Sequence, residues 1–262
     1  LSGLKKQLSS PGITPRLAVV MINPDERSKQ YVNLKLSKAA EIGIDVTLYD
    51  WSGLDYEACA AKMRQLAGSS ELNGIIVQLP TKGFEKTQKL LDLIPISKDV
   101  DGLSSASLEL LRQGKQKLIP ATPKAILKII EARSIQLTGK NILIIGQGQL
   151  VGLPLAIIMQ NRDLQVQTAD IKTQNLSELT KKADVIVAAA GSAGMLDGEM
   201  IKQGAIVLDA GASEANGKIV GDVDYESVGP QASVISKVPG GIGPVTVACL
   251  LENVLEATKN SQ

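Results

Sequence analysis

The chain of 262 residues is 44% hydrophobic and 21% charged, and its 28 Lys and Arg residues against 27 Asp and Glu residues leave a net charge of +1. This composition excludes a disordered chain, and the balanced charge disfavours nucleic acid and anionic membranes as partners. With no histidine and two cysteines, Cys59 and Cys249, the chain has neither a Ser-His-Asp triad, nor a histidine-ligated zinc, nor a disulfide framework. Since no apolar run reaches the roughly 18 residues of a membrane-spanning helix, we expect a soluble protein of a reducing compartment, the cytoplasm.

Short apolar runs, each followed by a helix-period stretch, predict alternating strands and helices. The runs are 17–22, 46–51 and 74–79 in the first half, and 141–145, 165–169, 185–190 and 205–210 in the second. Because the runs are apolar throughout, we expect mainly parallel sheets covered by helices on both faces. A polar segment at 112–123 separates the two series and predicts a domain boundary.

Four residues at helical spacing follow the first predicted strand: Ser28, Tyr31, Lys35 and Lys38. A phenol and an ammonium four residues apart can handle protons if a cleft desolvates the lysine and lowers its pKa. On spacing alone, an ordinary solvated helix face is the favoured interpretation. Gln78 lies at the carboxyl end of the third predicted strand, at the edge where ligands of open α/β sheets gather. A polar residue at the end of a strand needs no ligand, however, and that is the favoured interpretation locally.

Two carboxylates stand in the loop sequence Lys98-Asp-Val-Asp-Gly102. One of them can bind a heterocycle that presents adjacent N–H donors, and Asx turns explain such a loop equally well. No further Asp, Asn or Glu follows at ligand spacing, so we predict no metal site here.

The second series opens on the segment 120–123, where Thr122 is predicted to cap a helix over 124–133 and Pro123 to occupy its first turn. The next apolar strand runs into Gly146, Gly148 and Gly152 and then into a helix, a pattern that lets the backbone approach a pyrophosphate. Asp170 ends the following strand, where an acid commonly binds the ribose hydroxyls of NAD and repels the extra phosphate of NADP. A tight strand-to-helix turn with a solvated aspartate is the alternative.

The segment 238–244, Val-Pro-Gly-Gly-Ile-Gly-Pro, is rich in chain-bending residues. It is either a loop shaped against a ligand or a neighbouring domain, or a plain interdomain hinge. A long terminal helix is predicted to follow it, with apolar residues at helical spacing that do not identify the domain on which the helix packs.

Seven segments in this order make the chain resemble the bifunctional methylenetetrahydrofolate dehydrogenase/cyclohydrolase family. They are 28–35, 74–80, 98–102, 120–123, 146–154, 221–224 and 238–244. The resemblance implies hydride transfer from methylenetetrahydrofolate to a nicotinamide cofactor, NADP or NAD, and then addition of water to the methenyl product to give formyltetrahydrofolate. It also implies a homodimer formed through the dinucleotide domain.

The resemblance implies roles for individual residues. Lys35 would be the catalytic lysine, Tyr31 would stack on the folate, Gln78 would assist Lys35, and Asp101 would hold the pterin ring. A lysine of lowered pKa suits this chemistry, because attack of water on a methenyl cation needs chiefly a proton acceptor. The expected cofactor-binding residues are Gly146, Gln147, Gly148, Gly152, Asp170 and Thr122. The expected substrate-binding residues are Tyr31, Asp101, Pro239, Gly240, Gly241 and Pro244.

The dinucleotide segment departs from the family pattern. Gln147 and Gly148 stand where the family usually has Arg and Ser, Asp170 stands where many members carry His, and Ile171 replaces a Ser. These changes favour NAD over the family's more usual NADP.

We therefore expect an α/β enzyme of two domains, each with a mainly parallel sheet flanked by helices. Residues 1–121 plus 244–262 would form the folate-binding catalytic domain, and residues 122–243 a Rossmann-like dinucleotide-binding domain. Two alternatives to the bifunctional enzyme stay open. The first is a monofunctional dehydrogenase or cyclohydrolase. The second is a catalytically silent dinucleotide-binding regulator, which the altered glycine loop would permit.

Overall fold

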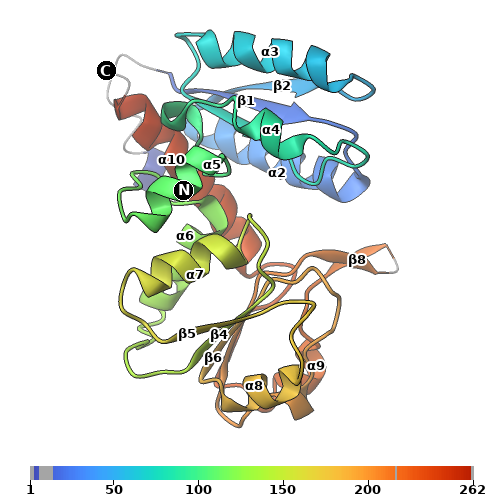
Figure 1. Cartoon of the computed structure of the whole chain (residues 1–262), viewed down its shortest axis with the longest axis vertical. Helices are drawn as coiled ribbons and strands as arrows, with labels where there is room; N and C mark the ends of the chain where they lie inside the picture. The colour runs from blue at the N-terminus through green and yellow to red at the C-terminus, as the bar shows by residue number, and fades with distance from the viewer. Residues whose placement is uncertain (1–2, 6–13, 216, 261–262) are drawn as a thin grey trace. The chain divides into compact units, whose positions relative to one another are not determined.

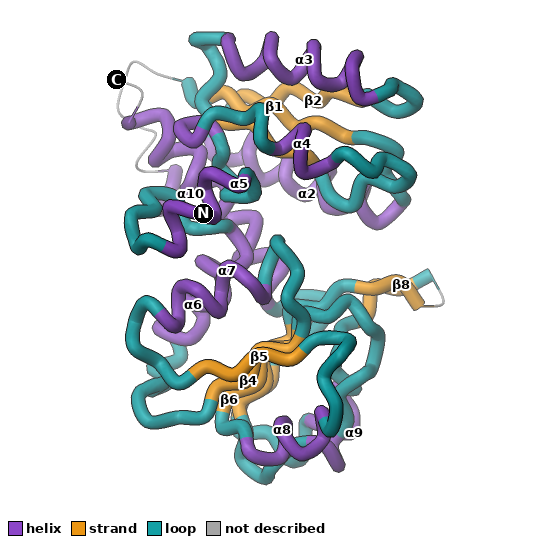
Figure 2. Tube along the Cα trace, viewed as in Figure 1, coloured by secondary structure: helices purple, strands orange, loops and turns teal. Residues whose placement is uncertain are grey.

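The computed structural model describes residues 3–5, 14–215 and 217–260 (Figure 1). Its contacts divide the chain into two units: unit 1 is Leu1–Ala121 with Val247–Gln262, and unit 2 is Thr122–Thr246. The chain returns to unit 1 at Val247, inside the last helix and three residues after the expected boundary at 244. Each unit contains its own parallel sheet with helices against it, which confirms the predicted fold class (Figure 2).

Unit 1 is built on a three-stranded parallel sheet of order β2-β1-β3. Its elements are β1 (Arg16–Met21), α2 (Glu26–Ile42), β2 (Asp45–Asp50), α3 (Tyr56–Gly68), β3 (Gly74–Val77), α4 (Thr87–Leu91), the 3-10 turn η1 (Ile96–Lys98), α5 (Ser105–Arg112) and most of α10 (Ile242–Asn260). The sequence predicted all three strands to within two residues of their observed ends.

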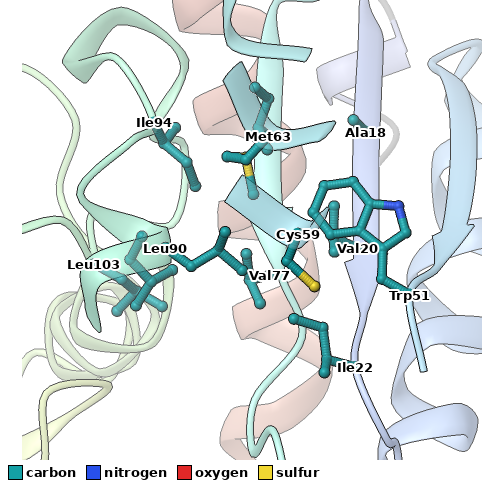
Figure 3. Close-up of a cluster of buried hydrophobic side chains, with 12 residues drawn as sticks. Ala18, Val20, Ile22, Trp51, Cys59, Met63, Val77, Leu90, Ile94 and Leu103 are labelled. Atoms are coloured by element: carbon teal, nitrogen blue, oxygen red, sulfur yellow. The ribbon is translucent and has the colours of Figure 1, made fainter. Parts of the chain in front are cut away.

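The core of unit 1 lies on both faces of β1. Alternate residues along and just after β1 (Ala18, Val20 and Ile22), together with Val77 of β3, point to one face of the sheet. There they pack with the single tryptophan, Trp51, and with Cys59 and Met63 of α3 (Figure 3). The other face of the sheet is covered by α2 (Figure 1). This accounts for the complete burial of Val19 and Val20, successive residues of β1 that point in opposite directions.

The last helix packs in unit 1 through a buried polar contact as well as its apolar stripe. Asn253 is fully buried, and its Nδ2 donates to the carbonyl oxygens of Val100 at 2.9 Å and Ile119 at 2.8 Å. The structure thus identifies the packing partner that periodicity left open. The sequence placed the start of this helix after Pro244, but α10 begins at Ile242, because proline is tolerated in the first turn of a helix.

Unit 2 is built on a five-stranded parallel sheet of order β10-β7-β6-β4-β5. Its elements are α6 (Ala121–Ala132), β4 (Ile142–Ile145), α7 (Gly152–Gln160), β5 (Val166–Ala169), α8 (Leu176–Lys182), β6 (Val185–Ala188), the 3-10 turn η2 (Gly198–Met200), β7 (Ile206–Asp209), β8 (Ser213–Ala215), β9 (Lys218–Val220), α9 (Tyr225–Val228) and β10 (Val234–Ile235). The antiparallel pair β8–β9 and the short strand β10 were not predicted. Strand β4 lies beside the second and third strands of the unit, β5 and β6, so the strand order reverses there.

Two local expectations were wrong. Strands β2 and β5 are sheet edges and expose four of six and two of four residues, so they are not covered on both faces as their sequences suggested. Thr122 is not the cap of the following helix, because α6 already begins at Ala121 and includes Thr122 and Pro123 in its first turn. Within the described residues, no helix combines the length and apolar character needed to cross a membrane.

Candidate active site

Lys35 and Gln78 form a direct contact within unit 1. The Nζ of Lys35 donates to the Oε1 of Gln78 at 2.9 Å, joining the middle of α2 to the residue that follows β3. Gln78 is held at both ends, since its backbone N–H donates to the Val20 carbonyl at 2.8 Å and its Nε2 donates to the Leu79 carbonyl at 2.7 Å. The amide is therefore oriented with its oxygen toward the lysine.

Asp101 supplies the charge that faces Lys35. Burial lowers the pKa of Lys35 below its ordinary value of 10.5, and the Asp101 carboxylate opposes that shift. Burial also raises the pKa of Asp101, while Lys35 lowers it and the neighbouring Asp99 raises it. The site thus favours a larger neutral fraction of Lys35 than an exposed lysine has, which is the form that can accept a proton.

Asp99 fixes the loop that carries Asp101. The buried Asp99 carboxylate accepts from the backbone N–H groups of Gly102 (2.9 Å), Leu103 (3.1 Å) and Ser104 (2.9 Å), and from the Ser107 hydroxyl (2.6 Å). The two carboxylates of this loop therefore differ in role: Asp99 accounts for the turn, and Asp101 faces Lys35. The sequence offered both interpretations without assigning them to particular residues.

Tyr31 and Lys38 occupy the same helix as Lys35 in different surroundings. Tyr31 lies one turn before Lys35 and is half-buried, and burial raises the pKa of its phenol while Arg27 opposes the shift. Tyr31 therefore keeps its proton at neutral pH. Lys38 forms an ion pair with Glu41 at 2.5 Å on the helix surface. The favoured interpretation from spacing, a solvated face, holds for Lys38 and not for Lys35.

In unit 2 the glycine turn follows β4, at the carboxyl edge of the sheet. A Cβ on Gly146 would lie 2.3 Å from the Ala189 carbonyl oxygen, and a Cβ on Gly152 would lie 1.7 Å from the Gly146 carbonyl oxygen. Gly146 also has a φ of 92°, so both positions require glycine for the protein's own packing. Gly148 is different, because a Cβ there would meet no atom within 4 Å.

The open face of Gly148 fits a bound dinucleotide. The next helix, α7, begins without a side-chain cap at Val151, so its first N–H groups are not engaged by a capping side chain. Gln147 turns back on the strand and its Nε2 donates to the Gly146 carbonyl at 3.1 Å. The Asp170 carboxylate is exposed at the end of β5, and its Oδ1 accepts from the Lys172 backbone N–H at 2.9 Å.

The remaining predicted residues occupy two segments of unit 2. Thr122 is in the first turn of α6, and Pro239, Gly240 and Gly241 precede α10. Gly240 has a φ of 102°, and a Cβ on Gly241 would lie 2.4 Å from the Lys237 carbonyl oxygen. Their binding roles, and that of Pro244 inside α10, stay predictions.

Two family models match the chain. One, described as the catalytic domain of tetrahydrofolate dehydrogenase/cyclohydrolase, matches residues 2–101, and the other, described as its NAD(P)-binding domain, matches residues 120–262. The chain belongs to the tetrahydrofolate dehydrogenase/cyclohydrolase family. The resemblance inferred from its seven segments is confirmed.

Individual relatives match almost the whole chain. It is 40% identical over 255 residues to bifunctional protein FolD 2 of Lactobacillus johnsonii, covering 97% of this chain and 90% of that relative. It is similar to the crystal structure of the bifunctional enzyme FolD, methylenetetrahydrofolate dehydrogenase/cyclohydrolase, from Campylobacter jejuni, with 37% identity, a TM-score of 0.94 and coverage of 100% of this chain and 95% of that one. The Trypanosoma brucei enzyme, solved with NADP and an inhibitor, matches at 29% identity with a TM-score of 0.91, covering 99% and 95% of the two chains.

Sequence reasoning missed three buried polar residues that shape these sites: Asn253, Asp209 and Asp222. Asp222 lies in the segment 221–224 that carried part of the family resemblance, but nothing in that segment alone shows that its first aspartate is buried. Asn253 is a polar residue within an otherwise apolar stripe of the terminal helix. A polar residue at a core position of a helix is the signal that could have identified it.

Proposed function

We propose that the chain catalyses both reactions of its family. It oxidises methylenetetrahydrofolate to methenyltetrahydrofolate with a nicotinamide dinucleotide, and it hydrolyses the methenyl compound to formyltetrahydrofolate. The observation that supports this most directly is the hydrogen bond of Lys35 to Gln78 beside Asp101, all within unit 1. Retention of these residues argues against a silent binding protein.

The hydrolytic step needs a proton acceptor near the attacking water. As the water oxygen bonds to the methenyl carbon, one of its protons must leave, and neutral Lys35 can accept it. When the bond between this carbon and one folate nitrogen breaks, the protonated Lys35 can return the proton to that nitrogen. The remaining proton of the attacking water leaves to solvent as the formyl C=O forms, so the reaction releases one proton overall. Gln78 orients the Nζ through its accepted hydrogen bond, and Asp101 stabilises the ammonium form between the two transfers.

Hydride transfer requires orientation rather than an acid. The lone pair of the adjacent folate nitrogen drives the loss of hydride, and a bound nicotinamide dinucleotide would accept it. We assign binding of the dinucleotide to the glycine turn, with the pyrophosphate near the N-terminus of α7 and the ribose near Asp170. We assign stacking on the folate to Tyr31 and recognition of the pterin ring to Asp101.

We further propose a preference for NAD over NADP. The carboxylate at Asp170 suits ribose hydroxyls and repels a phosphate in their place, and Gln147 adds no positive charge to attract one. The Asp170→Asn variant should lose much of this discrimination while keeping NAD binding within a few fold, as measured by calorimetric titration of both dinucleotides. Unchanged affinities for both would remove Asp170 from the site.

The first experiment follows the absorbance of the methenyl product after methylenetetrahydrofolate is mixed with the protein and either NAD or NADP. Formation of the product, followed by decay faster than in a protein-free control, is the expected result. Product without accelerated decay would indicate a monofunctional dehydrogenase. No product, but accelerated decay of methenyl compound supplied directly, would indicate a monofunctional cyclohydrolase, and neither activity would leave a binding protein.

The Lys35→Met variant tests the assigned base. It should reduce hydrolysis about 10²-fold or more, the usual range for loss of a general acid or base. Lys38→Met is the matched control, because Lys38 lies on the same helix and pairs with Glu41 at the surface. Hydrolysis at the parental rate by Lys35→Met would remove Lys35 from the mechanism.

We also propose that the enzyme acts in the cytoplasm as a homodimer formed through unit 2, as the family resemblance implies. Light scattering at enzyme concentrations used in the assays tests the dimer. A mass of one chain throughout that range would contradict it.

A further inference from the structure

Asp222 is a fully buried carboxylate that binds three successive backbone N–H groups. Its Oδ2 accepts from Ala190 at 2.6 Å and Gly191 at 3.0 Å, and its Oδ1 accepts from Ser192 at 2.8 Å. Successive N–H groups that converge in this way form a typical binding site for an anion. In this protein, the anion in that site is a side chain of the chain itself.

The segment 190–192 follows β6 and packs against the glycine turn. A Cβ on Gly146 would lie 2.7 Å from the Cα of Ala190, so the two backbones are in direct contact. Strands β4 and β6, which these segments follow, are neighbours at the point where the strand order of unit 2 reverses. Ligands of open α/β sheets bind at the carboxyl ends of the strands at such a point.

A second buried aspartate holds Asp222 itself. The carboxylate of Asp209, at the end of β7, accepts from the backbone N–H groups of Asp222 at 3.1 Å, Val223 at 3.1 Å and Gly211 at 2.9 Å. Two glycines leave room for these carboxylates, since a Cβ on Gly211 would lie 2.2 Å from the Asp222 Cγ, and a Cβ on Gly221 would lie 1.8 Å from the Asp209 Oδ2. The chain of contacts therefore runs from β7, through both aspartates, to the segment after β6 and on to the glycine turn.

We propose that Asp222 is a positioning residue for dinucleotide binding. Its carboxylate fixes the segment 190–192 against the glycine turn and occupies the N–H groups that would otherwise attract the ligand's phosphates. The pyrophosphate is thereby directed to the N-terminus of α7. This inference rests on the proposed function, because it concerns the dinucleotide of that reaction.

The Asp222→Asn variant tests the proposal with little change of shape. An amide keeps one acceptor oxygen but presents its NH2 group to at least one backbone N–H, so the segment 190–192 should loosen. We expect the KM and the dissociation constant for the preferred dinucleotide to rise about tenfold or more, with kcat largely restored at saturating dinucleotide. Asp224→Asn is the matched control, because Asp224 lies two residues on and caps the short surface helix α9.

Hydrolysis of directly supplied methenyl compound reports the folded state of unit 1 in the same preparations. A general loss of folded protein lowers kcat without raising KM, and that result in Asp222→Asn would overturn the proposal, as would a KM equal to that of Asp224→Asn. Asp209→Asn provides a second measure, because it leaves the Asp222 carboxylate in place but disturbs the contact to its backbone. A smaller rise in KM is expected there. If the wild-type chain binds neither NAD nor NADP, the proposed function itself fails, which is distinct from normal binding by Asp222→Asn.

Discussion

Replacing Asp99 by Asn should destabilise unit 1 and displace the loop that carries Asp101. The carboxylate accepts four hydrogen bonds, whereas an amide of the same shape has only one acceptor oxygen. If the NH2 group replaces Oδ2, the Ser107 hydroxyl can turn and accept, but the Ser104 backbone N–H is left facing a donor.

The magnitude follows from these contacts. A buried donor without an acceptor costs about 1–3 kcal/mol, and the two bonds that remain each lose about 1 kcal/mol because the acceptor is no longer charged. The variant no longer buries a charged carboxylate, and the desolvation energy that it saves offsets part of this loss. We therefore expect the free energy of unfolding to fall by about 3 kcal/mol.

Urea unfolding monitored by tryptophan fluorescence measures this change in the correct unit, because the only tryptophan, Trp51, is buried in unit 1. Asp92→Asn is the matched control: Asp92 is exposed and accepts from the Ser105 N–H at 2.8 Å, also at the start of α5. The free energy of unfolding of Asp92→Asn should fall by only about 1 kcal/mol, because the hydrogen bonds that Asp92 accepts from Gln88 and Ser105 are exposed to water. Equal unfolding midpoints for the two variants would refute the reasoning.

Three further results are expected. Gly152→Ala should destabilise unit 2, because its Cβ would lie 1.7 Å from a backbone oxygen. Gly148→Ala should unfold at the same temperature as the parent but bind dinucleotide more weakly. Thermal melts and calorimetric titrations that rank the two variants the other way would contradict the assigned packing. Burial raises the pKa of Asp209 from 3.8 to about 6, so the folded state binds this proton more tightly than the unfolded chain does. The contribution of Asp209 to the free energy of unfolding should therefore rise by about 1 kcal/mol as the pH falls from 7 to 5, and Asp209→Asn should lack this rise. If the difference in stability between wild type and Asp209→Asn did not change with pH, the raised pKa of Asp209 would be excluded. Because Asp101 raises the pKa of Lys35, Asp101→Asn should lower the pH at which the rate of methenyl hydrolysis, rising with pH, reaches half its maximum. A half-maximal pH that stays in place or rises would argue against Lys35 as the titrating base.

The strands were predictable because each is a compact apolar run. All seven predicted strands are present, and their ends differ from the prediction by at most two residues. The strands that were missed lack this signal: β8 and β9 form a short hairpin with polar residues, and β10 has two residues. Exposure of β2 and β5 was also missed, because the position of a strand within its sheet depends on topology rather than on its own sequence.

The site was less predictable than the fold. Lys35 and Gln78 are 43 residues apart, and only the parallel pairing of β1 with β3 brings the end of one strand to the helix that follows the other. Spacing along α2 therefore did not distinguish Lys35 from Lys38, although Lys35 binds Gln78 whereas Lys38 pairs with Glu41. The family resemblance supplied the residues, and the contacts supply a physical reason for Lys35, Gln78 and Asp101 to act together.

The tripeptide Asp-Val-Asp occurs once in each unit, at 99–101 and at 222–224. In both, the first aspartate is buried and binds three backbone N–H groups, while the second has a different environment: Asp101 faces Lys35 and Asp224 caps α9. The first aspartates should therefore have separable effects. Asp99→Asn should slow hydrolysis without changing the dinucleotide KM, because only the Asp101 loop is displaced, and Asp222→Asn should raise that KM without slowing hydrolysis. Kinetics of both reactions in both variants decide the matter. If Asp222→Asn slowed hydrolysis as much as Asp99→Asn does, and the dinucleotide KM were unchanged in both, these aspartates would only stabilise the fold.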